Sequence, residues 1–253
     1  MIELLQACLN GSREPAEHPA VPVTAAEVGR EARRAVDAGA GAIHLHPRGP
    51  DGRESLDPAA CAAAIDAVRT TCPGTPIGLT TGLWIAGDVQ ARLDLVAAWR
   101  VLPDFVSINF SEDGAEALAE FAIRLDIGVE AGLSSPADAR RLLNTTLEPR
   151  CVRLLVEIDQ ELDAERAVAL AKEIDTALDA GGSSRPRLHH GHGVATWAVI
   201  ERAIRFGYDV RVGLEDTLVL PDGRTARHSG DLVATAASMI RAAGWTLGSP
   251  RSS

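Results

Sequence analysis

Short aliphatic runs and longer amphipathic runs alternate along the whole chain. The short runs are rich in β-branched and other apolar residues, which is typical of strands, and the longer runs repeat apolar residues at helical spacing. The pattern predicts strands at residues 2–8, 42–46, 76–81, 104–110, 126–131, 152–158, 187–190 and 210–214. It predicts helices at residues 25–38, 58–71, 89–100, 114–125, 136–143, 163–178, 194–206 and 230–243.

Capping residues support the starts of the first two predicted helices. Thr24 stands at the N-cap of the first, and Glu27 lies three residues later, where its side chain completes a capping box. Asp57 stands at the N-cap of the second, followed by Pro58. Proline suits the first helical position because the missing N–H would have no partner there.

Eight strand–helix repeats imply a parallel sheet. In a chain of 253 residues the architecture that fits best is a (β/α)8 TIM barrel, formed as a single domain over residues 1–253. A doubly wound open sheet is the alternative architecture. No Gly-x-Gly-x-x-Gly follows the first strand, which disfavours a dinucleotide-binding fold.

Charge and composition narrow the class of partner. Hydrophobic residues make up 46% and aromatic residues only 4% of the chain, so aliphatic side chains must build the core. The formal net charge is −10. Such an acidic balance argues against nucleic acid or an anionic membrane as the main partner, although an anionic small substrate needs only a local arginine.

The cysteines and the N-terminal residues indicate the compartment. None of the four cysteines forms a Cys-x-x-Cys pair, so we expect reduced thiols and a cytoplasmic location. The first residues lack a basic segment followed by a long apolar one, and so do not predict a signal peptide. No apolar run reaches the length of about 18 residues that a transmembrane helix needs.

Two histidines separated by one residue stand out on the second predicted strand. Side chains on a strand alternate faces, so His44 and His46 point one way while Ile43 and Leu45 point the other. Two imidazoles on one face near a strand end are a candidate metal-binding pair.

The eighth predicted strand carries charge on one face. By the same alternation Arg211, Gly213 and Glu215 share a face, opposite the apolar residues between them, and Asp216 follows. If the strands close into a barrel and their polar side chains point toward its axis, these side chains converge at one mouth of the barrel. This inward-facing set comprises His44, His46, Thr80, Ser107, Asn109, Glu130, Arg211 and Glu215.

A purely structural interpretation competes with the catalytic one. A carboxylate inside a barrel is costly to bury unless a cation accompanies it. Glu215 pairs simply with Arg211 in that interpretation, and Glu130 is a second partner of the same arginine. A divalent metal explains more, because two neutral imidazoles and one carboxylate form a common catalytic zinc set with an open position. Iron(II) uses the same ligands, so another divalent metal is possible.

Two further features near the barrel mouth have open roles. Three histidines lie at the end of the seventh predicted strand: His189, His190 and His192. Their role as metal ligands, as substrate contacts or as loop residues without either function is left open by the sequence. Arg48 follows the first histidine pair and either binds an anionic group or anchors its loop.

With these residues placed, the chain resembles the β-keto acid cleavage enzymes, including the 3-keto-5-aminohexanoate cleavage proteins, over nearly its whole length. The most specific motifs are His44-Leu-His46-Pro-Arg48 and Arg211-Val-Gly-Leu-Glu-Asp216, taken together at this separation. The segments 9–12, 24–28, 50–57, 80–82 and 107–109 complete the resemblance.

The resemblance implies a zinc-dependent barrel enzyme that exchanges acyl groups between a β-keto acid and acetyl-CoA, yielding acetoacetate and a new CoA thioester. It also implies a homo-oligomer. Carried over by position, the zinc ligands are His44, His46 and Glu215. The catalytic residues are Asp216, Arg211 and Glu130. The substrate contacts are Thr80 and Ser107, to which Asn109, Arg48 and Glu14 are added as candidates.

The chemistry of these residues agrees with that activity. A divalent ion polarises a ketone oxygen, Arg211 holds a carboxylate, and Asp216 is a candidate general base. The only lysine, Lys172, lies in a predicted helix, which disfavours a Schiff-base mechanism.

Two departures from longer relatives leave the keto acid and the CoA contacts open. No glycine-rich loop follows the sixth strand, where residues 156–161 run straight into a helix, and the seventh strand ends in His-His-Gly-His-Gly. The alternative functions are a metal-dependent barrel hydrolase and a non-catalytic ligand-binding barrel.

Overall fold

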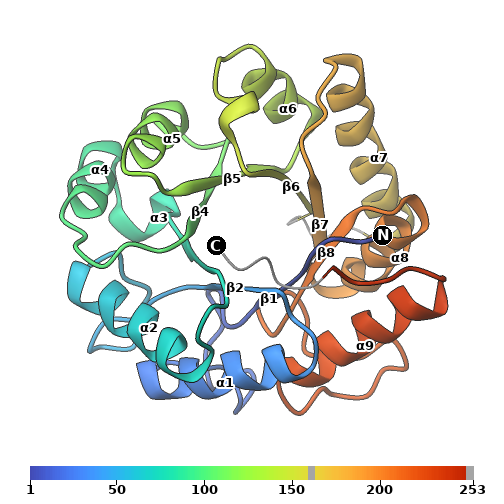
Figure 1. The fold of residues 1–253 in the computed structure, drawn as a ribbon, viewed down its shortest axis with the longest axis horizontal. Helices are drawn as coiled ribbons and strands as arrows, with labels where there is room; N and C mark the ends of the chain where they lie inside the picture. The colour runs from blue at the N-terminus through green and yellow to red at the C-terminus, as the bar shows by residue number, and fades with distance from the viewer. Residues whose placement is uncertain (159–162, 249–253) are drawn as a thin grey trace.

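The computed structural model describes residues 1–158 and 163–248 and shows a closed parallel barrel whose strands follow in the order β1 to β8 (Figure 1). The strands are β1 (Leu5–Cys8), β2 (Ala42–Leu45), β3 (Ile77–Thr80), β4 (Phe105–Asn109), β5 (Gly128–Leu133), β6 (Arg153–Ile158), β7 (Arg187–Gly191) and β8 (Asp209–Val212). Each strand pairs in parallel with its neighbours, and β8 pairs with β1 to close the ring.

Helices surround the barrel as an outer ring (Figure 1). They are α1 (Ala25–Asp37), α2 (Pro58–Thr71), α3 (Leu83–Ala86), α4 (Val89–Ala97), α5 (Ala115–Arg124), α6 (Pro136–Leu143), α7 (Ala164–Ala180), α8 (Thr196–Phe206) and α9 (Ser229–Ala242), with 3-10 turns η1 (Glu148–Arg150) and η2 (Gly193–Ala195). The predicted alternation of strands and helices is therefore confirmed. The open-sheet alternative is wrong, because an open sheet has two unpaired edge strands and here β8 is bonded to β1.

The predicted caps of the first two helices are present. Thr24 accepts a hydrogen bond from the Glu27 amide, and the Glu27 carboxylate accepts one from the Thr24 amide, so the capping box is complete. Asp57 accepts from the amides of Ala59 and Ala60 at the start of α2. These short-range signals explain why α1 and α2 begin where the sequence predicts.

Some predicted boundaries were wrong. The fifth strand starts at Gly128 rather than residue 126, because Asp126 has a φ of 60° and turns the chain first. The short helix α3 was not predicted. The expectation that residues 156–161 run straight into a helix falls partly on residues 159–162, outside the described residues.

Alternation of faces divides the barrel into a polar interior and an apolar outer layer. The outward-facing strand residues, such as Ile43, Leu79 and Val129, are fully buried against the helices. Inside, Thr80 lies beside Ser107 and Ser107 beside Glu130 in the strand register. The aliphatic core predicted from the scarcity of aromatics therefore lies between sheet and helices. Polar residues make up most of the inward faces, where the Phe105 ring also packs against Gly78.

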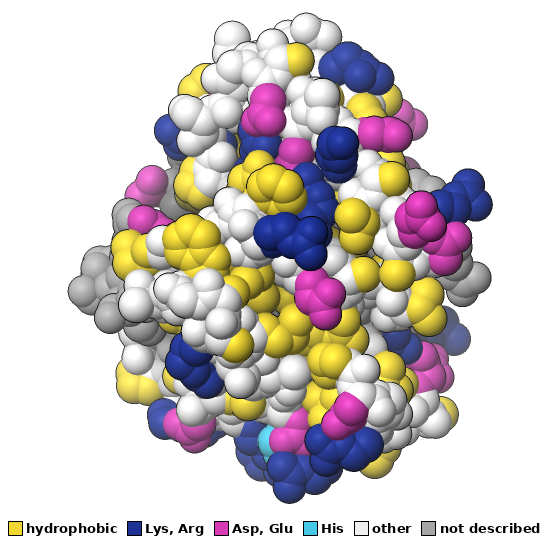
Figure 2. Space-filling model, turned by 90° about the vertical axis from the view of Figure 1, so that its right-hand side faces the viewer, with side chains coloured by type: hydrophobic (Ala, Val, Ile, Leu, Met, Phe, Trp, Pro, Cys, Tyr) yellow, Lys and Arg dark blue, Asp and Glu magenta, His cyan; other side chains and the backbone are white. Residues whose placement is uncertain are grey.

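The outer surface on the side of α7 to α9 carries mixed charges. Figure 2 shows acidic and basic side chains interspersed with hydrophobic ones there, without a field of one sign among the side chains drawn in colour. All four cysteines are buried and free. Among the described residues, no helix combines the length and apolarity needed to cross a membrane.

Candidate active site

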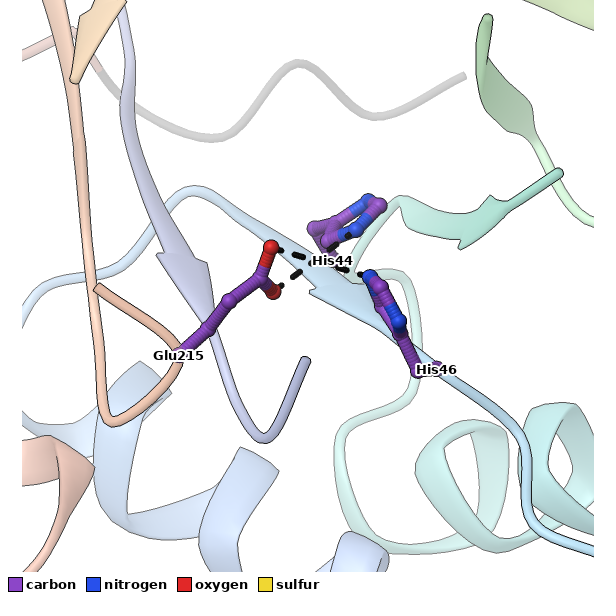
Figure 3. Close-up of side chains that lie close together, drawn as sticks. All are labelled: His44, His46 and Glu215. Atoms are coloured by element: carbon purple, nitrogen blue, oxygen red, sulfur yellow. Dashed lines mark ion pairs between the residues drawn. The ribbon is translucent and has the colours of Figure 1, made fainter. Parts of the chain in front are cut away.

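Two histidines and a glutamate face one another at the C-terminal ends of the strands (Figure 3). His44 lies on β2, His46 directly follows it, and Glu215 lies in the loop after β8. His44 Nε2 is 3.8 Å from Glu215 Oε2, and His46 Nε2 is 3.6 Å from Glu215 Oε1. All three side chains are buried. We call these residues the β2-side cluster.

Two glycines make room for Glu215. The turn that carries it starts at Gly213, where a Cβ atom would lie 1.7 Å from the carbonyl oxygen of Cys8. Gly11 has a φ of 55°, and a Cβ atom there would lie 2.4 Å from Glu215 Cγ. Any larger residue at either position would collide with β1 or with the glutamate side chain. The Asn-Gly turn after β1 and the Val-Gly-Leu-Glu motif therefore fit together in space.

His46 is held from two sides. Its amide donates to Asn10 Oδ1 over 2.9 Å, and its carbonyl accepts from Asn10 Nδ2 over 2.9 Å. Its Nδ1 atom pairs with Glu54 Oε1, and Glu54 Oε2 accepts from the Trp84 indole over 3.2 Å. A carboxylate on the far ring nitrogen orients the ring and directs Nε2 toward Glu215.

Charge within the β2-side cluster favours ionised Glu215 and neutral His44. Burial alone would raise the pKa of Glu215, but Arg211, His46 and His44 hold it well below its usual range. Burial and the Arg211 guanidinium lower the pKa of His44 well below its usual value. For His46, burial acts to lower the pKa, but Glu215 and Glu54 raise it overall.

The β2-side cluster fits a divalent cation. Glu215 Oε2 is buried and has no hydrogen-bond partner, which is costly for a carboxylate oxygen unless a cation faces it. Two imidazole nitrogens and this oxygen form the three-ligand set of catalytic zinc sites. The predicted pairing of Arg211 with Glu215 is also present, through Glu215 Oε1, so Oε2 is the oxygen left for a cation.

Asp216 turns the other way and meets different partners. Its Oδ1 atom is 3.0 Å from His190 Nδ1, 3.5 Å from His192 Nε2 and 3.9 Å from Arg211 Nη2. The Cys8 thiol donates to Oδ2 over 2.8 Å. Complete burial raises the pKa of Asp216 to about 6, although Arg211 and His192 act in the opposite direction. We call His190, His192 and Asp216 the β7-side cluster.

The three histidines after β6 separate into two environments. His189 faces the helices: it lies 3.5 Å from Asp175 of α7, and its ring stacks on Tyr208. His190 and His192 face the barrel mouth. Alternation along β7 accounts for this division, which the sequence left open.

Glu130 lies inside the barrel, but it bonds Gln6 and Arg153 and not the residues at the mouth with which it was expected to converge. Gln6 donates to Glu130 Oε1 over 2.6 Å, and Arg153 pairs with the same oxygen at 2.5 Å. Glu130 is therefore not a second partner of Arg211. It pairs with Arg153 because the two residues lie side by side in the β5–β6 register. Glu130 Oε2 is buried without a hydrogen-bond partner.

Three candidate substrate contacts line the inner faces of neighbouring strands. Thr80 on β3 is buried, and its hydroxyl accepts from the Gly82 amide over 3.3 Å. Ser107 and Asn109 on β4 are half-buried. Their place beside Thr80 agrees with the predicted inward face.

Arg48 and Glu14 lie farther out, on the rim. The Arg48 guanidinium donates to the carbonyls of Gly11 over 2.5 Å and Arg13 over 2.8 Å, so it anchors the loop after β1. Glu14 is exposed. Both line a cleft of about 700 Å³ that also includes Glu54 and Trp84. This cleft opens beside the carboxylate that holds His46.

Several residues of the site had no signal in the sequence. Glu54, Cys8 and Glu157 come from separate segments, and only the closed barrel brings them to the histidines and Asp216. Asn10 and Gly11 were noted within the early Asn-Gly segment, but not as the support of His46 and Glu215. Their roles depend on which strands are neighbours.

A family model described as beta-keto acid cleavage enzyme matches residues 4–158 and 163–252. The 3-keto-5-aminohexanoate cleavage enzyme of Fusobacterium nucleatum is 25% identical over 268 residues, covering 98% of this chain and 94% of that protein. A 3-oxoadipate:acetyl-CoA acetyltransferase of Cupriavidus necator is 35% identical over 66 residues, covering 26% of this chain and 23% of that protein.

Among solved structures, the ternary complex of ObcA with C4-CoA adduct and oxalate has a TM-score of 0.74 and 17% identity. The match covers 92% of this chain and 66% of ObcA, so this chain spans about two thirds of the length of that protein. At this identity the likeness concerns the barrel alone.

Proposed function

The chain belongs to the beta-keto acid cleavage enzyme family, and on this premise we propose that it is a zinc-dependent acyltransferase. It condenses a β-keto acid with acetyl-CoA to give acetoacetate and an acyl-CoA. The observation that carries the proposal is the convergence of His44, His46 and Glu215 beside the Arg211–Asp216 pair. Binding of CoA and keto acids by this chain is part of the proposal.

The proposed metal ligands are His44 Nε2, His46 Nε2 and a Glu215 carboxylate oxygen. When bound, a zinc ion polarises the ketone of the substrate and stabilises the negative charge that develops on its oxygen. The chain supports this set directly: Glu54 holds the His46 ring, and Gly11 leaves room for Glu215. Another divalent ion with the same ligand preference is compatible with these residues.

Asp216 is proposed as the general base. In its ionised form it takes a proton from the carbon between the ketone and the carboxylate of the substrate. The carbon made nucleophilic in this way bonds to the acetyl carbon of acetyl-CoA, and the CoA thiolate leaves. The CoA thiolate then attacks the original ketone carbon, and the bond between the two carbons breaks, so that the ketone carbon leaves as the acyl group on CoA sulfur. Asp216 returns its proton to the carbon left behind, which gives acetoacetate.

Arg211 is proposed to stabilise the negative charges of Glu215, Asp216 and the substrate carboxylate during this acyl exchange. It already bonds Glu215 and lies 3.9 Å from Asp216 Oδ1. A buried guanidinium there keeps Glu215 ionised, acts against the rise in the pKa of Asp216 that burial causes, and offers a contact for the carboxylate of the keto acid. Thr80, Ser107 and Asn109 are proposed substrate contacts on the opposite wall, and Glu130 is proposed to act from the barrel floor through its unpartnered oxygen.

A substrate screen tests the proposal. A panel of β-keto acids is incubated with acetyl-CoA and the protein, with and without zinc, and acetoacetate and acyl-CoA are measured together. The proposal expects both products in equal amounts, and their loss in Asp216→Asn. Consumption of substrate without acetyl-CoA indicates a hydrolase instead, and ligand binding with no turnover across the panel indicates a non-catalytic barrel.

The homo-oligomer and the cytoplasmic location stay predictions. The oligomer is measured by light scattering at several protein concentrations. Assembly independent of concentration supports it, and a monomer throughout that range contradicts it.

A further inference from the structure

His190 and His192 have no part in the proposed reaction, yet both lie against the Asp216 carboxylate at the barrel mouth. His190 is completely buried, and His192 is half-buried. Like His44 and His46, they are separated by a single residue at the end of a strand. The β7-side cluster thus repeats the composition of the β2-side cluster: two imidazoles from one strand end and one carboxylate from the loop after β8.

The distances in the β7-side cluster match a metal site. Ligand bonds of about 2.0–2.1 Å in a tetrahedral zinc site place neighbouring ligand atoms about 3.3 Å apart. His190 Nδ1 and His192 Nε2 lie 3.0 Å and 3.5 Å from Asp216 Oδ1, and the three ligand atoms are all within 4.8 Å of one another. The two spacings to Asp216 Oδ1 are therefore within a few tenths of an ångström of the value for a zinc site.

A second carboxylate lies behind His190. Its far ring nitrogen, Nε2, is buried and is 3.5 Å from Glu157 Oε1 on β6. Ligating histidines usually present the far nitrogen to a carboxylate, which sets the tautomer and the ring orientation. Glu157 therefore lies behind His190 on the side where Glu54 lies behind His46, but at 3.5 Å it is not within a hydrogen bond of the ring, as Glu54 is.

The backbone around the β7-side cluster is fixed by hydrogen bonds. The Gly193 amide donates to the carbonyl of Asp216 over 2.8 Å, and the His192 amide donates to that of Ile158 over 2.9 Å. The Thr196 hydroxyl donates to the Gly191 carbonyl over 2.7 Å. These bonds tie the ends of β6 and β7 to the loop after β8, so the backbone that carries the three residues is held in place.

We propose that His190, His192 and Asp216 form a second binding site for a divalent transition-metal ion, separate from the β2-side cluster. Two imidazoles and one carboxylate suit Zn²⁺, Fe²⁺ or Co²⁺ rather than Mg²⁺ or Ca²⁺, which prefer all-oxygen ligands. Three protein ligands leave at least one position open to water or to a ligand. The Arg211 guanidinium lies between the two clusters and reduces the repulsion of neighbouring carboxylates when no metal is bound.

An ion in the β7-side cluster would occupy the oxygen of Asp216 that is assigned to proton transfer. Excess Zn²⁺ is therefore expected to slow the reaction after the first equivalent has supported it. This consequence rests on the proposed function, whereas the existence of the site does not.

Metal stoichiometry tests the site without any assay of activity. Protein stripped with a chelator is equilibrated with excess Zn²⁺, passed through gel filtration, and its bound metal is measured by mass spectrometry. The expected result is two equivalents for the wild type, one for His192→Ala, one for His44→Ala and none for the double variant. His228→Ala, a histidine substitution at the start of α9 outside both clusters, is the control and is expected to retain two.

Each outcome bears on the inference. One equivalent in the wild type, lost in His44→Ala and kept in His192→Ala, overturns it. One equivalent lost in His192→Ala but kept in His44→Ala supports this site and contradicts the metal ligands named in the proposed function. Because His192 is half-buried, its substitution leaves the core intact, and circular dichroism together with a His192→Gln variant checks that metal loss is not loss of fold. In Co²⁺-loaded protein, the visible absorption of the wild type is expected to be the sum of those of the two single variants.

Discussion

The β2-side and β7-side clusters each hold two histidines and one carboxylate, but Arg211 compensates the charge of the carboxylate more fully in the first than in the second. In the β2-side cluster, Glu215 bonds Arg211 and its pKa is held well below the usual range. In the β7-side cluster, Asp216 stands 3.9 Å from that guanidinium and burial raises its pKa to about 6. Arg211 therefore stabilises the ionised form of Glu215 more strongly than that of Asp216, the next residue in the chain.

This difference in pKa suits Glu215 to binding a cation and Asp216 to accepting a proton. A carboxylate held ionised at all ordinary pH values is suited to stay bound to a cation. A carboxylate that titrates near neutrality is suited to exchange a proton. The proposed division of labour between Glu215 and Asp216 thus follows from a shift of one residue along the loop after β8.

The largest effect on activity is expected from a substitution that disrupts the β2-side cluster and leaves the β7-side cluster intact. His44→Ala removes a metal ligand, so we expect the rate of acetoacetate formation to fall about a thousandfold, since a bound ion contributes several kcal/mol to stabilising developing charge. The measurement is kcat/KM with the best keto acid of the screen, alongside metal content. Full activity in a metal-free variant would contradict the assignment.

A smaller effect is expected from crowding Glu215 without removing any ligand. In Gly11→Ala the new Cβ atom would lie 2.4 Å from Glu215 Cγ, so the glutamate must move and activity is expected to fall about a hundredfold, as displacements of about 1 Å do. Gly74→Ala is the matched control, because Gly74 has a φ of 80° with no atom within 4 Å of an added Cβ. It introduces backbone strain alone and is expected to leave activity near that of the wild type. Equal losses in both variants would show that strain, not contact with Glu215, is responsible.

Removing the carboxylates behind the histidines is expected to sharpen the contrast between the clusters. Glu54→Gln weakens the orientation of His46, so zinc affinity of the β2-side cluster is expected to fall about tenfold. Glu157→Gln is expected to do the same for the β7-side cluster only. Calorimetric titration of each variant separates the two affinities, and a change in the opposite cluster would argue against independent support.

The smallest effect is a slope in stability with pH. Because the pKa of Asp216 is raised from 3.8 to about 6 on folding, metal-free folded protein binds a proton there that the unfolded chain has released. Its free energy of unfolding is therefore expected to decrease as pH rises from about 4 to about 6. Urea unfolding of wild type and Asp216→Asn across this range measures it. Parallel curves would contradict the raised pKa, and saturating zinc is expected to remove the difference if the β7-side cluster binds it.

The sequence was sufficient for residues whose placement follows from alternation along one strand. The spacing predicts that His44 and His46 share one face and Arg211 and Glu215 another, and together with closure of the barrel it predicts that all four meet at one mouth, as they do. Alternation is a local rule, so it needs no knowledge of neighbouring strands.

Residues whose partners depend on register were not predictable in the same way. The pairing of Glu130 with Arg153 rather than Arg211 follows from the β5–β6 register. The support of His46 by Glu54 depends on how the loop after β2 folds back, as shown by the bridge between Arg48 and Glu54. The direction of Asp216 is set by the turn that begins at Gly213, beyond the end of β8. Strand periodicity has no information about any of these.

If ions bind both clusters, the position of Glu215 and Asp216 on one short turn is expected to couple the two binding events thermodynamically. A shift of the turn that improves the geometry at one cluster displaces the carboxylate of the other, since the two are consecutive in the chain. Linkage requires that whatever factor the first ion applies to the affinity of the second is returned unchanged in the reverse direction. The loop after β8 would then transmit the effect of one bound ion to the other cluster. The cooperativity between the two ions, positive or negative, would depend on the peptide bond that joins Glu215 to Asp216.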